Sequence, residues 1–245
     1  MPLDIPVADL VRQLSRVGLR PDDRLVEHIL AYGPSARPEL LRLAMCTEAL
    51  HSEYPADLGP LHALRLLGEL PDAEMIVPLL GGLPVAVYGE EDVPAQLYAT
   101  ELLQIIGRVG EPAVPMLWAY SDDAANDAMS RAAAINALAY VATYAPAVRE
   151  AVVAEGRRRL ALADLTMPIA TGVVTMLAEL GDAASYQAVM AAYRAGRVDT
   201  AHAPAAAARQ FLLGKGREDL ACVNHPLAER YDHHGPQQET PDDDA

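Results

Sequence analysis

The sequence has few cysteines and no long apolar run. Its two cysteines, Cys46 and Cys222, lie far apart in a chain of 245 residues. This spacing excludes a disulfide framework and favours a reducing compartment. No stretch approaches the about 18 uninterrupted apolar residues that predict a membrane helix. The first ten residues also lack the basic and apolar regions of a signal peptide, so we expect a cytoplasmic protein without a membrane partner.

Basic residues are scarce, and the formal net charge is −15 at pH 7. Residues 1–150 carry 10 Lys and Arg against 21 Asp and Glu. Such a surface repels phosphate backbones, which makes nucleic acid an unlikely partner. We expect a partner that presents a basic face, although a negative surface that only aids solubility is an open alternative.

What is abundant is Ala, Leu and Val, in a pattern typical of helices. In "LHALRLLGELPDAEMIVPLL", Leu61, Leu64 and Leu67 recur at helical spacing, and a second apolar stripe follows Pro71 and Asp72. The stretch therefore predicts two helices joined by a short turn. One such pair cannot bury both of its apolar faces, so it needs neighbours.

Similar helix pairs recur along the chain. Breaks between the paired helices are predicted at Gly33, Leu70, Gly110, Ala145 and Gly181, which are 35 to 40 residues apart. Glycine at the end of a first helix suits the left-handed cap, and Pro or an acidic residue after it suits the start of the second helix.

The stretches "ALRLLGELPDAEMIVPLL" and "ATELLQIIGRVGEPAVPMLW" resemble HEAT-like repeats of the short bacterial type. The resemblance covers about residues 22–196 and is strongest in the second and third units. It implies an all-α, right-handed α-solenoid of about five helix pairs with capping helices. The repeat motif is structural, so the resemblance implies no catalytic residues.

The two ends differ from the repeats. An amphipathic helix at 7–17 and a helix at 203–214 are expected to cap the stack. We therefore predict a single domain over 1–214. From residue 215 the chain turns polar and ends in an acidic run, which predicts a C-terminal tail that is at least partly disordered.

The binding surface is predicted on the second helices of the pairs and on one long connection. Aromatic side chains often carry the energy of an interface. The candidate aromatic anchors are Trp118, Tyr120, Tyr186 and Tyr193. The connection at 81–96 adds Tyr88, Glu90, Glu91 and Asp92, either as a recognition loop or as a tolerated insertion.

Three groups of residues have alternative chemical interpretations. Thiolate and imidazole ligands could bind zinc near the C-terminus, but a polar segment packed on the last repeat is favoured there. The residues concerned are Cys222, His225, His233 and His234. A helix cap is favoured over a cation or acid–base site at Asp122, Asp123 and Asp127. A solvated helix end is favoured over an anion site at Arg157, Arg158 and Arg159.

No catalytic motif or cofactor signature is recognisable, and His28 and His62 are expected to be structural histidines. The leading hypothesis is therefore a non-enzymatic scaffold without a cofactor that binds a protein or peptide. The alternative is a nucleic-acid enzyme similar to the HEAT-like DNA alkylpurine glycosylases, which the net charge disfavours. A third possibility is similarity to the HEAT-like lyase subunits that handle phycobilisome pigments. No residue specifically supports it.

Overall fold

The computed structural model describes residues 5–89 and 92–235. Every regular element in these residues is an α-helix or a short 3-10 helix, with no strand among them. The prediction of an all-α chain is therefore confirmed.

The chain divides into two compact units, where the sequence predicted one domain over 1–214. Unit 1 consists of Met1–Leu70, Val85–Leu102 and His225–Ala245, and unit 2 consists of Pro71–Pro84 and Leu103–Asn224. The boundary falls inside helix α6 (Val93–Gly107).

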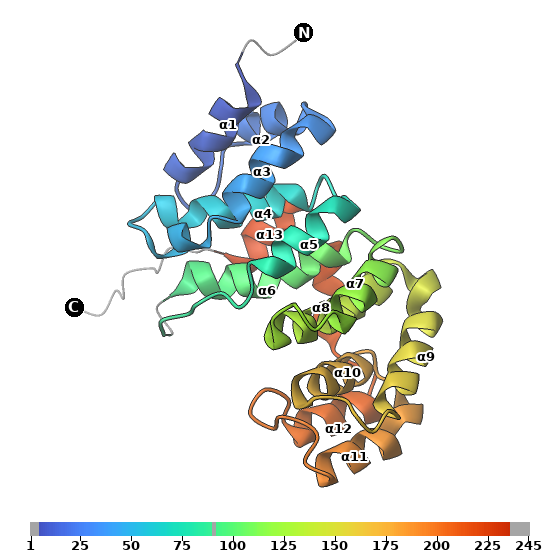
Figure 1. Cartoon of the computed structure of the whole chain (residues 1–245). Helices are drawn as coiled ribbons and strands as arrows, with labels where there is room; N and C mark the ends of the chain where they lie inside the picture. The colour runs from blue at the N-terminus through green and yellow to red at the C-terminus, as the bar shows by residue number, and fades with distance from the viewer. Residues whose placement is uncertain (1–4, 90–91, 236–245) are drawn as a thin grey trace, which may run out of the picture. The chain divides into compact units, whose positions relative to one another are not determined.

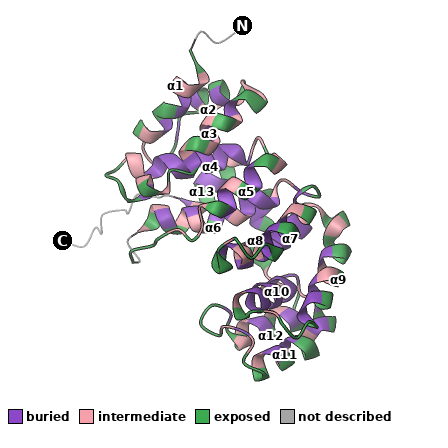
Figure 2. Cartoon of the chain, in the orientation of Figure 1, coloured by how far each residue is buried: buried purple, intermediate pink, exposed green. Residues whose placement is uncertain are grey.

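Unit 1 is built around α4 (Gly59–Leu67), all nine residues of which are buried. Figure 2 shows this helix in purple along its length. It packs against α3 and α13. The other elements of unit 1, besides the first part of α6, are α1 (Val7–Gln13), η1 (Leu14–Arg16), α2 (Asp23–Leu30), η2 (Gly33–Ala36), α3 (Arg37–Ala44), η3 (Thr47–His51), η4 (Ala56–Leu58) and α13 (Leu227–His234).

Unit 2 is centred on two neighbouring, largely buried helices, α8 (Ala128–Tyr144) and α10 (Met167–Glu179) (Figure 1). The Asp127 side chain caps α8 by accepting hydrogen bonds from the backbone N–H groups of Met129 and Ser130. Besides the end of α6, the remaining elements are η5 (Ala73–Met75), α5 (Ile76–Gly81), α7 (Ala113–Asp122), η6 (Pro146–Val148), α9 (Arg149–Leu160), η7 (Ala183–Ser185), α11 (Tyr186–Arg194), α12 (Ala205–Leu213) and η8 (Glu218–Asn224).

The predicted breaks between paired helices coincide with turns in the structure. A helix ends before each of the five positions, and a new helical element begins at or shortly after it. Gly110 and Gly181 have φ values of 73° and 65°, in the left-handed region that glycine adopts without steric cost. The helix pairs themselves are therefore present.

In the segment from residue 215, which is predicted to be a polar and partly disordered tail, the described residues include two helical elements. Residues Glu218–Asn224 and Leu227–His234 are helical. Leu220 and Val223 are buried in unit 2, and Arg230 and Tyr231 are buried in unit 1. These side chains find partners on helices distant in sequence, which composition alone does not reveal. The predicted disorder of 236–245 lies outside the described residues.

Candidate functional site

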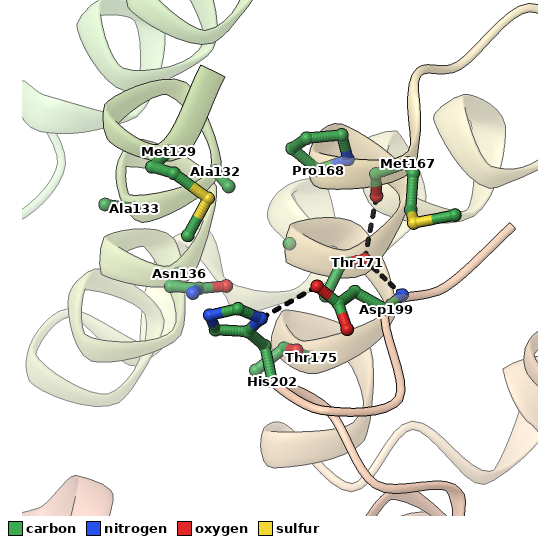
Figure 3. Close-up of a pocket in the computed structure, with 11 residues that line it drawn as sticks. Met129, Ala132, Ala133, Asn136, Met167, Pro168, Thr171, Thr175, Asp199 and His202 are labelled. Atoms are coloured by element: carbon green, nitrogen blue, oxygen red, sulfur yellow. Dashed lines mark hydrogen bonds and ion pairs between the residues drawn. The ribbon is translucent and has the colours of Figure 1, made fainter. Parts of the chain in front are cut away.

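A pocket of about 270 Å³ opens in unit 2 between α8, α10 and the 195–204 segment that joins α11 to α12. Figure 3 shows side chains of α8 on one side and those of α10 on the other. Its lining residues are Met129, Ala132, Ala133, Asn136, Met167, Pro168, Thr171, Gly172, Thr175, Asp199 and His202. Most of the lining is apolar, and none of these described residues is Lys or Arg.

One carboxylate–imidazole pair lies at this pocket. The Nδ1 atom of His202 is 2.8 Å from Oδ2 of Asp199. The hydrogen bond from His202 is the main cause that lowers the pKa of the Asp199 carboxyl, and a backbone N–H bond from Ala201 adds to it. An ionised carboxylate only accepts hydrogen bonds, so Nδ1 of His202 carries the proton. The other ring nitrogen, Nε2, is then an acceptor when the imidazole is neutral.

Hydrogen bonds to two helices hold this pair in place. The backbone N–H of Asp199 donates to Oγ1 of Thr171 at 2.9 Å, and Thr171 donates in turn to the carbonyl of Met167 at 2.7 Å. The hydroxyl of Tyr193 donates to the carbonyl of Ala203 at 2.9 Å. The 195–204 segment is thus fastened to α10 on one side and to α11 on the other.

A smaller cavity of about 110 Å³ adjoins the first and shares Thr175 and His202 with it. Its lining includes Tyr193 and Phe211. The two cavities together follow one side of α10, with His202 where they meet. We call them the α10 groove.

The groove can bind a group that is mostly apolar and carries a hydrogen-bond donor. A neutral imidazole oriented by a carboxylate accepts a hydrogen bond or a proton from a group in the pocket. Thr175, which carries a hydroxyl group, also lines both cavities. This arrangement suits recognition of a ligand that carries a donor.

Two of the predicted anchors, Trp118 and Tyr120, are buried in unit 2. They are 9% and 8% exposed, respectively. The guanidinium of Arg159 lies 4.2 Å from the ring centre of Trp118 and forms an ion pair with Asp122. The hydroxyl of Tyr120 donates to Ser130 at 3.3 Å. Both aromatic side chains therefore offer little surface to a partner.

The other two predicted anchors lie on α11 and are half-buried. Tyr193 lines the α10 groove, whereas Tyr186 is not among the residues that line it. The structure thus brings one of the predicted aromatic residues to the candidate site.

The predicted recognition loop lies in unit 1 from Val85 onward, so it belongs to a different unit from the α10 groove. Tyr88 is 78% exposed, and its ring contacts that of His51 edge-on. Oδ2 of Asp92 accepts the backbone N–H of Tyr88 at 2.9 Å and lies 3.4 Å from Nδ1 of His51. Glu90 and Glu91 lie outside the described residues. The role predicted for this loop stays a prediction.

The histidines near the C-terminus are in contact with one another. Nδ1 of His225 is 3.1 Å from Nε2 of His234, and the rings of His225 and His233 are 5.9 Å apart. Cys222 is buried. Over residues 5–89 and 92–235, no group of three or more His, Cys, Asp or Glu side chains is arranged to hold a metal ion.

The basic run at the end of α9 is paired with carboxylates, where the sequence favoured a solvated helix end. Arg157 forms an ion pair with Asp182, and Arg158 pairs with Glu155. The Arg159 side chain is only 8% exposed and pairs with both Asp122 and Glu155. The run therefore ties helix ends together.

Sequence reasoning missed the pair at the pocket and the residues around it. The one signal available was Asp199-x-x-His202 in a connection between Gly196 and Pro204, where a carboxylate and an imidazole are three residues apart. Asn136 and Thr171 lie within apolar helical stretches and carry no signal of their own.

Comparison of the chain with family models, curated proteins and solved structures gives no match. Within the described residues, no helix is both long and apolar enough to cross a bilayer.

Proposed function

We propose that the chain is a non-enzymatic binding protein that holds a segment of another protein or peptide in the α10 groove. The observation that carries the proposal is the pair of adjoining cavities along α10, apolar for most of their length and joined at His202. Concave, mostly apolar sites with a few placed polar groups are typical of ligand binding.

The repeated helix pairs support the same proposal. Pairs of helices at a spacing of about 37 residues resemble HEAT-like repeats, and stacked repeats of this kind form surfaces that bind other proteins. We propose that the five pairs form a solenoid of this type. The α10 groove lies between the first helices of the fourth and fifth pairs, α8 and α10, whereas the sequence predicted a binding surface on the second helices.

Charge favours a partner with donors and a basic face. The chain has a formal net charge of −15. The larger cavity has Asp199 in its lining and neither Lys nor Arg among its described residues. A partner surface rich in Lys and Arg would be attracted to such a protein, and its association would weaken as salt is added.

The proposal is tested with a variant whose larger side chain fills the groove. In Ala133→Phe, a half-buried lining residue gains a ring that occupies the larger cavity. We expect affinity for the partner to fall at least about tenfold, because a filled pocket excludes the anchoring group of the partner. Partners are first recovered with the full-length protein from lysate of the source cells, and the affinity of each purified partner is then measured by calorimetry.

The matched control is Ala188→Phe, which adds the same ring at an exposed position of α11 outside both cavities. It should bind like the unaltered protein, and both variants should unfold at similar urea concentrations. Equal binding by Ala133→Phe and the unaltered protein would contradict the proposal, as would the recovery of no stoichiometric protein.

A further inference from the structure

We infer that the larger cavity of the α10 groove is a site for a compact, neutral aromatic group that carries one hydrogen-bond donor, of the indole class. The inference rests on the proposed function, since it names the chemistry that a partner would insert there. It follows from the volume of the cavity, the acceptors in its lining and the absence of Lys and Arg from its described lining residues.

Two acceptors in the lining are available to a donor. When the imidazole of His202 is neutral, its Nε2 atom has a lone pair for a donor, because the proton is on Nδ1, which donates to Asp199. The Oδ1 atom of Asn136 is buried and has no hydrogen-bond partner in the part of the chain that the structure describes. Figure 3 shows the ring of His202 on the side of the pocket that Asn136 occupies. An N–H group between them would satisfy an acceptor that is otherwise costly to bury.

The size and walls of the cavity suit a flat ring. An apolar cavity of about 150 Å³ is enough to bind benzene. The pocket measures about 270 Å³, which leaves room for a bicyclic ring. The small residues Ala132 and Ala133 on α8 and Gly172 on α10 line the cavity. Gly172 lets α10 approach α8 closely, because a Cβ atom there would lie 3.1 Å from the carbonyl oxygen of Ala132.

Two methionines complete the lining. Met129 and Met167 are 43% and 48% exposed, which places them at the mouth of the cavity. Thioether sulfur atoms make favourable contacts with aromatic rings, and the flexible side chains adapt to a ring of varied shape.

The charges around the cavity further restrict the class of ligand that fits it. The Asp199 carboxylate disfavours an anion, and no Lys or Arg among the described lining residues would offset it. The apolar walls disfavour an ammonium ion, which would lose its hydration there. A neutral ring with a single N–H group meets both conditions.

The experiment titrates the full-length protein, labelled with ¹³C at its methionine methyl groups, with indole. We expect the methyl signals of Met129 and Met167 to shift and saturate, while that of Met75, which is buried in unit 2 and lies outside both cavities, stays in place. The matched ligand 1-methylindole has the same ring without the donor, and it should bind at least tenfold more weakly. Indole-3-acetate should also bind more weakly than indole.

A variant tests the acceptor directly. Asn136→Leu keeps a side chain of similar size without the Oδ1 atom, and it should bind indole at least tenfold more weakly while its affinity for 1-methylindole changes little. Absence of shifts at Met129 and Met167, or equal affinity for indole and 1-methylindole, would overturn the inference. Since 1-methylindole needs no variant, the comparison holds even where Asn136→Leu is unstable.

Failure of this inference is distinct from failure of the proposed function. If Ala133→Phe abolishes partner binding and indole does not bind, the groove holds a partner of other chemistry and only the inference falls. If indole binds as expected and no protein partner is recovered, the pocket is a small-molecule site and the partner proposal falls.

Discussion

Replacing Glu101 with Gln is expected to lower the free energy of unfolding by about 3–5 kcal/mol, the range for breaking a buried ion pair by removing one partner. Glu101 lies on the part of α6 that belongs to unit 1, and its side chain is 2% exposed. Two guanidinium groups face it. The side chains of Arg65 and Arg230 are both fully buried.

The geometry explains why the loss is large. Nε of Arg65 donates to both oxygens of Glu101, at 3.1 and 2.9 Å, and a further bond runs from its Nη2 atom. Nη1 of Arg230 is 3.7 Å from Oε2 of Glu101. A neutral amide in place of the carboxylate leaves the positive charges of two buried side chains without their common counter-charge.

The measurement is urea unfolding followed by far-UV circular dichroism, with the slope of the transition compared between variants. A shift of the midpoint at constant slope reports a change in stability alone. A loss smaller than about 1 kcal/mol would contradict the prediction, since that is the range for exposed ion pairs.

The control removes all three charges at once. The triple variant Arg65→Met, Glu101→Met, Arg230→Met replaces the cluster with apolar side chains, and we expect it to be more stable than Glu101→Gln. The reason is that a buried charge cluster pays a desolvation cost that an apolar replacement avoids. If the triple variant is the less stable one, the cluster contributes more than its charge balance explains.

The helix pairs could be predicted because their signals are local. Apolar spacing sets each helix, and Gly110 and Gly181 set turns through their own backbone preference. The cap at Asp127 is equally local, because its side chain bonds to backbone groups two and three residues later.

The helical structure and packing of the C-terminal residues could not be predicted, because they depend on contacts with residues distant in sequence. The segment around Arg230 and Tyr231 is polar and charged, which suggests a tail. In unit 1 it becomes α13, since Glu101 on α6 faces Arg230, and His62 on α4 faces Tyr231. No window of sequence contains both members of either pair.

The pocket could not be predicted from the sequence for the same reason. Its acceptors, Asn136 and His202, come from α8 and from the 195–204 segment. Trp118 and Tyr120 are predicted as anchors because they are large aromatic residues, but the sequence does not distinguish an exposed anchor from a core residue. Burial decides that question, and it is a property of the packed unit.

A second large effect is expected on acidification, through His62. This side chain is fully buried in unit 1, and burial, with a smaller contribution from the nearby charge of Arg65, lowers its pKa from 6.5 to about 4. Its Nε2 atom is 2.9 Å from the carbonyl of Gly18, and its Nδ1 atom is 2.7 Å from the hydroxyl of Tyr231. A carbonyl only accepts, so Nε2 carries the proton and Nδ1 accepts from Tyr231.

The direction of the effect follows from which state takes up the proton first. Between pH 6.5 and about 4, the imidazole of the unfolded chain is protonated while that of the folded chain stays neutral. The unfolded state therefore binds more protons in this window, and stability falls as the pH falls. The contribution of His62 is fully present above pH 6.5 and is lost by about pH 4. The pKa difference corresponds to about 3 kcal/mol.

His62→Gln isolates this contribution, because it removes the titrating group and leaves the other histidines in place. The pKa of His234 is also lowered by burial, so the unaltered protein and the variant should share the part of the pH dependence that His234 causes. Urea unfolding across this pH range should show that the advantage of the unaltered protein over His62→Gln shrinks by about 3 kcal/mol on acidification. Parallel stability curves would mean that the pKa of His62 is the same in the folded and unfolded states. That result would exclude a neutral imidazole that is hydrogen-bonded to both Gly18 and Tyr231.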